Sequence, residues 1–457
     1  MAALLYAQEE DTGRMKDPIT LLGYLIVIAA VYRWLRQRQL MRRMREKKAV
    51  KAARKPQVLK PKSECDCPVC REGEMRKAPV EREQPPAWST CKGKGGPKKK
   101  VSTQGQACWN PECVYFGIVD EKIHALVGCG GHGKKEWIQD LKCQACKMKF
   151  TIRKNTVMYR LKKGTGEVEI VVHLLGLGVD PSALEQVFGI RESTIRTWQA
   201  RCGMHSQKLH ERFMTGLNPV HVQLDELWAN TKNEGQALWV WVVTDAQTKL
   251  IPVLQVGGRT QDMAYRVVHE LKHRLRPGCV PVFSSDGLKH YFYALTAHFG
   301  RWERPEGKKR VWTLLGEFAY AQVIKHQRRH RTVEVERRLL WGNGVNFRDR
   351  LKAAGLSGRI NTAFVERVNL TIRQCVSKLT RRTWGPAHFA PELVEHLEWW
   401  RCYYHFIRYH ESLATKLPQP ENGRGRQRLY RRRTPAMAAG LTSRRWTVRE
   451  FLLYPLP

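Results

Sequence analysis

The sequence predicts a multidomain protein in which a small metal-binding module and a helix-turn-helix precede an α/β domain. Three observations lead to this prediction. The 457 residues suffice for about two to four domains of roughly 100–200 residues each. Nine of the thirteen cysteines lie between Cys65 and Cys146. Strand-like and helix-like runs alternate over residues 219–300, which is typical of an α/β domain.

The charge of the chain indicates a polyanionic partner. There are 80 Lys and Arg against 42 Asp and Glu, a formal net charge of +38. Such a charge repels itself in a compact state unless a polyanion neutralises it, most often nucleic acid and next anionic lipid. Solubilisation of the surface is the alternative. A hydrophobic share of 42% excludes a wholly disordered chain, and a mean hydropathy of −0.49 excludes a polytopic membrane protein.

Residues 1–62 are expected to form an apolar helix followed by a basic helix or arm. Residues 19–32 carry no charge and as a helix would span about 21 Å, less than the roughly 30 Å core of a bilayer. A short membrane anchor, a self-association helix and a buried helix remain as alternatives. Residues 33–62 hold thirteen Lys or Arg and one acid, a run suited to phosphates or a lipid surface. Residues 63–104 are expected to be a linker.

Residues 105–160 have the cysteine spacing of a zinc ribbon. The segments CWNPEC and CQAC place two thiols each at a tight turn, and the four ligands are Cys108, Cys113, Cys143 and Cys146. Four thiolates suit a tetrahedral structural Zn²⁺, and binding the metal supplies most of the folding energy of so small a module. The long loop between the two pairs also holds His124, Cys129 and His132, which leaves the ligand choice open. A second set of thiols, Cys65, Cys67, Cys70 and Cys91, leaves a second zinc site open as well.

Residues 161–215 are predicted to contain a helix-turn-helix. Gly189 turns the chain between the two helices, and Ser193 is the expected N-cap of the second. The positions expected to face inward are Ala183, Leu184, Val187, Ile195 and Trp198. The positions expected to face outward at the start of the recognition helix are Glu192, Thr194, Arg196 and Thr197. An ordinary helical hairpin that does not touch DNA is the alternative.

Residues 216–412 are predicted to form the α/β domain, and three carboxylates stand at its key positions. HVQLDELWA alternates as a strand with Asp225 near its middle, and a buried strand ends at Asp286, where Gly287 lets the chain turn. A hairpin turned at DAQTK, which contains Asp245, and a helix over TQDMAYRVVHELKHRL lie between them. The segment NTAFVERVNLTIRQCVSKLTRR is expected to be one long helix with Glu366 near its start.

If these three carboxylates lie close together in the folded protein, they can form a metal site. Three acids are too repulsive to sit together without a cation, and two Mg²⁺ or Mn²⁺ ions held between them form a phosphoryl-transfer site. Each acid taken alone is equally well explained as a solvated surface group.

The segments LDELW, SSDGLKHY and NTAFVERVNLTIRQCVSKLTRRTW resemble the three catalytic segments of DDE transposases of bacterial insertion sequences. These enzymes belong to the retroviral-integrase-like superfamily, so the resemblance implies an RNase H-like domain with a mixed sheet and flanking helices. It implies a catalytic, magnesium-binding triad of Asp225, Asp286 and Glu366. It also implies that four further residues contact DNA or position the helix: Lys325, Arg367, Asn369 and Arg373.

The expected function is therefore a DNA transposase. It would bind the terminal inverted repeats as double-stranded DNA and carry out magnesium-dependent strand cleavage and strand transfer into target DNA, as a homo-oligomer when bound. The expected location is the cytoplasm, associated with the nucleoid. A transposase-derived DNA-binding protein without catalysis and a membrane-tethered DNA-binding protein built on residues 19–62 are the alternatives. Residues 413–457 are expected to be a basic tail that ends in one apolar helix, TPAMAAGLTSRRWTVREFLL.

Overall fold

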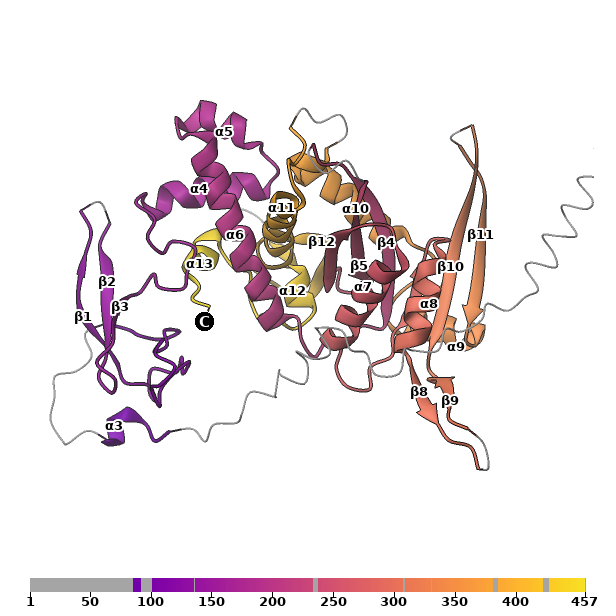
Figure 1. Cartoon of the computed structure of the whole chain (residues 1–457), viewed down its shortest axis with the longest axis horizontal. Coiled ribbons are helices and arrows are strands. Elements are labelled where there is room, and N and C mark those ends of the chain that lie inside the picture. The colour runs from indigo at the N-terminus through magenta and orange to yellow at the C-terminus, as the bar shows by residue number, and fades with distance from the viewer. Residues whose placement is uncertain are drawn as a thin grey trace, which may run out of the picture. The chain divides into compact units, whose positions relative to one another are not determined.

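The structure is a computed structural model, and it describes residues 85–91, 101–134, 136–232, 237–306, 309–329, 331–380, 385–421 and 427–456 (Figure 1). The chain divides into two compact units, Met1–Val58 and Leu59–Pro457, and every described residue belongs to the second. The predictions for residues 19–62 and for Cys65, Cys67 and Cys70 lie outside the described residues. Within the described part, no helix is long and apolar enough to cross a membrane.

The α/β domain is built on a mixed sheet of six strands in the order β11-β10-β7-β4-β5-β6. The central strand β4 (His221–Ala229) pairs antiparallel with β5 (Leu238–Asp245), which pairs antiparallel with β6 (Val253–Gly257). On its other side β4 runs parallel to β7 (Val282–Ser285), and β7 runs parallel to β10 (Ala319–Arg328). The edge strand β11 (Arg331–Trp341) is antiparallel to β10. The predictions of an α/β domain with a mixed sheet, of the strand around Asp225 and of the hairpin are confirmed.

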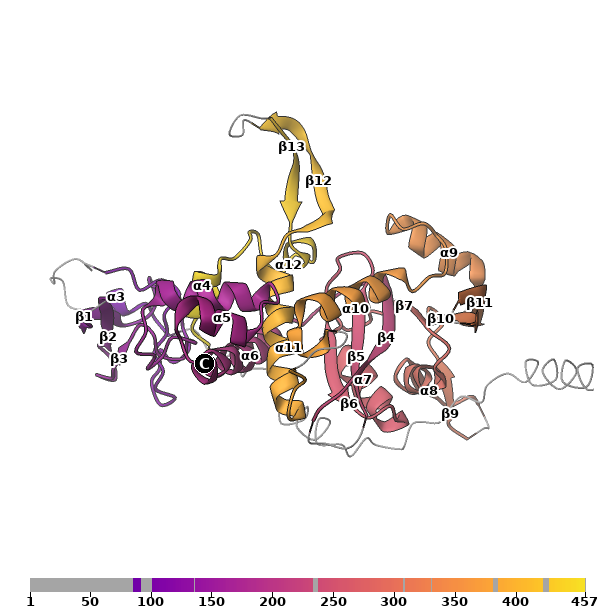
Figure 2. The same ribbon diagram turned by 90° about the horizontal axis from the view of Figure 1, so that it is seen from above.

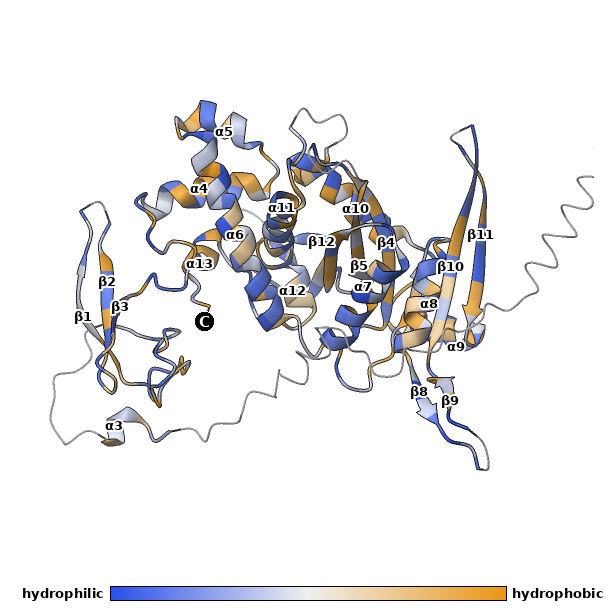
Figure 3. Cartoon of the chain, in the orientation of Figure 1, coloured by the Kyte–Doolittle hydropathy of each residue, from blue (hydrophilic) through white to orange (hydrophobic). Residues whose placement is uncertain are grey.

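Helices flank this sheet on both faces (Figure 2). On one side lie α7 (Gln261–Arg274) and α8 (Lys289–His298), the connections that let β7 and β10 run parallel to β4. On the other side lies α10 (Ala363–Cys375), whose Val365, Val368 and Ile372 are buried against β4 and β5. Hydrophobic residues are concentrated in these central strands, whereas the tip of the β10–β11 hairpin is hydrophilic (Figure 3).

A second core joins the helices before the sheet to the end of the chain. It contains α4 (Thr165–Gly176), α5 (Pro181–Phe188) and α6 (Glu192–Phe213), together with α12 (Pro435–Ala438) and α13 (Val448–Leu453). α11 (Ala390–Cys402) lies between the two cores, since Trp399 is buried in this one and Trp400 in the core of the sheet. α6 approaches α11 so closely that a Cβ on Gly203 would meet the backbone of Glu395 at 2.3 Å. The segment expected to be a tail therefore ends in a packed core.

The cysteine-rich module contains a small antiparallel sheet of three strands, β1 (Leu126–His132), β2 (Ile138–Cys143) and β3 (Lys149–Thr151). A short helix, α3 (Trp88–Cys91), precedes it, and Trp88 packs edge-on against Tyr115. Buried around these strands are Leu126, Leu141 and Phe150. The core of the module also contains the buried thiols of Cys108, Cys113 and Cys143.

Several elements were not predicted. They are the hairpin β8 (Gly300–Glu303) and β9 (Val311–Leu314), the hairpin β10–β11, the hairpin β12 (His410–Glu421) and β13 (Arg428–Arg433), the helix α9 (Gly344–Ala353), and the π-helical turn η3 (Tyr403–Ile407). The three hairpins pair strands that are largely polar, and such strands leave only a weak signal in the sequence.

Four expectations are wrong. The long helix around Glu366 ends at Cys375, and a 3₁₀ turn η2 (Ser377–Leu379) follows. The apolar helix expected at the end of the chain is two short helices, each begun by the side chain of a threonine cap. Arg191, not Ser193, is the N-cap of α6. Ala183 and Val187 are exposed rather than inward, whereas Leu184, Ile195 and Trp198 are buried as predicted.

Candidate functional site

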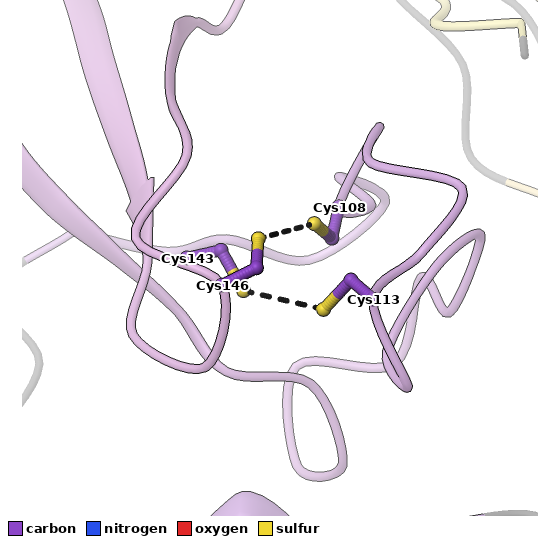
Figure 4. Close-up of side chains that lie close together, drawn as sticks. All are labelled: Cys108, Cys113, Cys143 and Cys146. Carbon is purple, nitrogen blue, oxygen red and sulfur yellow. Dashed lines mark hydrogen bonds between the residues drawn. The ribbon is translucent and has the colours of Figure 1, made fainter.

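The structure brings the four predicted thiols together (Figure 4). Cys108 and Cys113 come from the loop before β1, Cys143 ends β2, and Cys146 lies in the turn that leads to β3. In that turn Lys147 adopts a left-handed conformation with φ 62°, which reverses the chain and aims both thiols at one point. The Sγ atoms of Cys108 and Cys146 are 3.5 Å apart, and those of Cys113 and Cys143 are 3.9 Å apart.

These distances match a tetrahedral metal site. Sulfur ligands at about 2.3 Å from Zn²⁺ in a tetrahedron lie about 3.8 Å from one another. Burial raises the pKa of Cys108 and of Cys113. Burial also acts to raise the pKa of Cys146, but hydrogen bonds from the backbone of Met148 and from neighbouring side chains outweigh it and lower that pKa to about 7. A cation that accepts thiolates resolves the crowding of four buried sulfurs.

The other residues named for this module do not join the cluster. His124 is buried with both ring nitrogens engaged, one on the carbonyl of Thr103 and the other on the backbone N–H of Leu126. His132 pairs with Asp140 at 3.2 Å on the surface. Cys129 is exposed, and Cys91 lies with its Sγ 3.8 Å from the hydroxyl of Tyr115. Among the described residues, the predicted four are thus the thiols of this module that lie close enough together to hold a metal ion.

The second cluster consists of carboxylates at the centre of the sheet. The parallel register of β4 and β7 pairs Leu224 with Ser285. The residues that follow these two, Asp225 in β4 and Asp286 just after β7, therefore lie level with each other. One carboxylate oxygen from each of these two side chains and one from Glu226 lie within 4.8 Å of one another. Two carboxylates from neighbouring parallel strands therefore meet as the sequence predicts.

The electrostatics of this cluster favour a bound cation. Burial, and then the charges of Asp286 and Glu226, raise the pKa of Asp225 to about 7. Burial and the charge of Asp286 likewise raise the pKa of Glu226 to about 7, and burial raises the pKa of Asp286. Three acids whose pKa values are raised, by burial first and for Asp225 and Glu226 also by neighbouring charges, gain from a divalent cation that neutralises them.

Glu366 stands at the edge of this cluster. It lies in the first turn of α10 and adds to the repulsion felt by Asp225 and Asp286. Its Oε1 accepts hydrogen bonds from Lys325 Nζ and from Thr362 Oγ1, each at 2.6 Å. Its carboxylate is thus oriented by a cation of β10 and lies outside the group of oxygens that are within 4.8 Å of one another.

Two groups near the cluster were missed by the sequence reasoning. Glu226 is 8% exposed; it forms an ion pair with Arg259 and accepts a hydrogen bond of 3.0 Å from the hydroxyl of Tyr291. Arg259 also lies 4.0 Å from Asp286 and over the ring of Trp239. The adjacent acids in LDELW are the signal for Glu226. No signal in the sequence points to Arg259, which follows β6 in a Gly-Gly-Arg loop.

The residues expected to contact DNA or to position α10 fall into two kinds. Asn369 is buried and donates from Nδ2 to Asp225 Oδ2 at 2.8 Å, so it positions that carboxylate. Lys325 positions Glu366 in the same way. Arg373 donates to the carbonyl of Trp228 at 3.4 Å, and Arg367 is exposed on α10.

At the start of α6 the predicted recognition residues differ in exposure. Thr197 is exposed and Thr194 is half-buried. Arg196 is held by Glu192 of the preceding turn, with Nε 2.7 Å from the carboxylate oxygen. It borders a surface hollow that Lys378 and Glu392 also line.

The arrangement has the ligands for hard divalent cations at the carboxylates and for a thiophilic one at the cysteines. No protein-family model matches the chain, and no curated protein matches it significantly.

Proposed function

We propose that this chain is a DNA transposase of the DDE class, which cleaves DNA strands and transfers them by magnesium-dependent phosphoryl transfer. The observation that carries the proposal is the level placement of Asp225 and Asp286 at neighbouring parallel strands, with Glu366 of α10 beside them. The strand order, three antiparallel strands followed by two parallel to the first, supports an RNase H-like domain.

Each residue of the carboxylate site would have its own role in this reaction. Asp225, Asp286 and Glu366 would hold Mg²⁺, which when bound activates the attacking water or hydroxyl and stabilises the leaving oxygen. Asn369 and the backbone N–H of Glu226 each donate to one oxygen of Asp225 and so fix the orientation of that carboxylate. Lys325 holds Glu366 until DNA and metal arrive, and its cation is then placed to meet a phosphate.

The parts before the sheet would supply DNA binding. The geometry of Cys108, Cys113, Cys143 and Cys146 supports a structural zinc ribbon. The short helix α5, the left-handed Gly189 at φ 63° and the longer α6 support a helix-turn-helix. Its recognition residues would be Thr194, Arg196 and Thr197, with Arg196 leaving Glu192 to reach a base edge. The net charge of +38 suits double-stranded DNA of the inverted repeats and the target.

A DNA-binding protein without catalysis is the second candidate. It is favoured by the engaged state of two of the acids, since Lys325 binds Glu366 and Arg259 binds Glu226. The charge of an acid that is paired with a cation of the chain is neutralised without any metal.

One set of variants tests both candidates on a duplex that carries the ends of the element. Asp225→Asn, Asp286→Asn and Glu366→Gln should each lower Mg²⁺-dependent cleavage by about 10³-fold or more and leave DNA affinity nearly unchanged. Asp262→Asn, on an exposed acid of α7, is the matched control and should cleave normally. Glu226→Gln tests the neighbour: if it abolishes cleavage while Glu366→Gln does not, Glu226 replaces Glu366 as the third ligand. Absence of Mg²⁺-dependent cleavage by the wild type, with DNA binding intact, would leave the second candidate; full cleavage by all of the variants would remove these acids from the site.

A further inference from the structure

The hairpin formed by β12 (His410–Glu421) and β13 (Arg428–Arg433) follows α11 and its π-helical turn along the chain and precedes α12. We call it the β12–β13 ribbon. Its base is anchored: Leu413 is 5% exposed, and Arg433 Nε donates to the carbonyl of Leu413 at 2.8 Å. Beyond the base, Figure 2 shows the ribbon projecting away from α12, and Arg428–Arg432 of β13 are exposed.

The ribbon is strongly basic. Residues 410–433 contain seven Lys or Arg and two Glu. The register pairs Lys416 with Tyr430, and because side chains two apart on a strand share a face, Arg428 and Arg432 lie on that face as well. Tyr430 is 57% exposed among these three cations. Arg431 points to the opposite face.

Most of these charges have no internal compensation in the described part of the chain. Glu421 of β12 is the cross-strand partner of Arg428, but no described ion pair joins a carboxylate to Lys416, Arg431 or Arg432, whereas Arg266 and Arg301 elsewhere pair with Asp262 and Glu303. Like charges gathered on one face of a two-stranded ribbon are destabilising, and such a ribbon is only marginally stable alone. The ribbon is therefore stabilised when an external polyanion lies along it.

The shape of the ribbon fits a groove of duplex DNA. The ends of β12, His410 and Glu421, pair with Arg433 and Arg428, so the two strands lie side by side over the six residues of β13, about 17 Å at a rise of roughly 3.3 Å per step. The major groove admits a two-stranded β-ribbon. An anionic membrane also carries phosphates, but it offers a plane, which meets one face of a ribbon, whereas cations stand on both faces here.

We infer that the β12–β13 ribbon is a second DNA-binding element that grips the phosphates of a duplex groove without reading its sequence. The inference rests on the proposed function only in that the chain binds duplex DNA. Lys416, Arg428, Arg431 and Arg432 contact the phosphates, and Tyr430 lies against the sugar-phosphate edge. The ribbon then adds affinity to any duplex, and specificity stays with α6.

The test is the salt dependence of binding by the full chain to a 40-base-pair duplex of random sequence. The quadruple variant Lys416→Gln, Arg428→Gln, Arg431→Gln and Arg432→Gln removes about four phosphate contacts, each worth about 0.9 in the slope of log K against log salt. Between 50 and 200 mM salt, the wild type should therefore lose about 100-fold more affinity than the variant. The matched control neutralises four exposed cations outside the ribbon, Arg266, Arg301, Arg304 and Lys352, and should keep the wild-type slope.

A charge-preserving variant, with Arg428, Arg431 and Arg432 replaced by Lys, should also keep the wild-type slope. This result would show that the quadruple variant changes the slope because it loses charge and not because the ribbon unfolds. A quadruple variant that binds with the wild-type slope would overturn the inference. So would a quadruple variant that keeps DNA binding and loses binding to vesicles of phosphatidylserine and phosphatidylcholine. Failure of the proposed function has a different signature, because cleavage would then be absent while wild-type binding and its slope remain.

Discussion

Asp225→Asn should stabilise the metal-free protein even though it removes a predicted metal ligand. Among the described residues no cation pairs with Asp225; its oxygens accept from the backbone N–H of Glu226 at 2.9 Å and from Asn369 at 2.8 Å. The two neighbouring carboxylates lie within 4.8 Å. One such charge pair repels by about 3.5 kcal/mol at an effective dielectric constant of about 20.

The pKa of Asp225 gives a similar magnitude and fixes the sign. The folded-state pKa is raised from 3.8 to about 7, and each unit corresponds to about 1.4 kcal/mol, so the full shift is worth about 4 kcal/mol. Because the folded protein binds the extra proton between these two pKa values, wild-type stability falls as the pH rises from about 4 to 7. Allowing for partial exposure of the side chain, we expect the variant to gain about 3 kcal/mol at pH 8 and less than half of that at pH 5.

The local hydrogen bonding permits this substitution. The introduced asparagine would still accept from the N–H of Glu226, and its amide would face Asn369. Asn369 Oδ1 has no hydrogen-bond partner among the described residues, so a flip of the Asn369 amide turns an acceptor toward the new donor.

Amide hydrogen exchange in β4 and β7, in magnesium-free buffer at pH 8 and pH 5, measures the gain in stability of the sheet. Because exchange is followed strand by strand, it distinguishes this gain from unfolding elsewhere in the chain. Added Mg²⁺ should slow exchange in the wild type and not in the variant. Asp262→Asn is the control and should change neither result. If Asp225→Asn instead destabilises β4 and β7 relative to the wild type by the same amount at pH 8 and pH 5, the Asp225 carboxylate stabilises the fold, and the expected repulsion is wrong.

Three further predictions follow from packing and coordination. Cys143→Ser should release one zinc per chain, measured by metal analysis, and lose protection of β1–β3 in hydrogen exchange; full retention of zinc would remove Cys143 from the site. Lys325→Gln should change stability by less than about 1 kcal/mol, because both partners of its ion pair are 40% exposed, and should lower the Mg²⁺ concentration needed for half-maximal cleavage; a higher requirement would mean that Lys325 assists metal binding. Phe451→Ala should destabilise α4–α6 by about 3–5 kcal/mol in hydrogen exchange, since Phe451 is fully buried against Trp399; unchanged exchange would detach the C-terminal segment from that core.

The sequence alone determined the local elements whose residues repeat with a clear period and the sites whose ligands are close in the chain. Strand alternation located β4 and the β5–β6 hairpin. The paired spacing of the cysteines named all four thiols of the cluster, because each pair is set by a tight local turn. The end of β7 was also found, since a buried strand followed by Asp-Gly has few other interpretations.

Tertiary structure alone decided which groups surround those acids. Strand alternation places Asp225 and Glu226 on opposite faces, and only the three-dimensional arrangement brings Glu226 to Asp286 and Arg259 to both. Lys325 is 41 residues from Glu366 along the chain, and no local pattern connects them. The C-terminal segment resembles a basic tail because its apolar residues are few and split, yet Trp446 and Phe451 complete the core of α4–α6. Residues close together in the chain determine local periodicity. These contacts instead depend on how distant elements pack, and no fixed spacing in a single sequence predicts that packing.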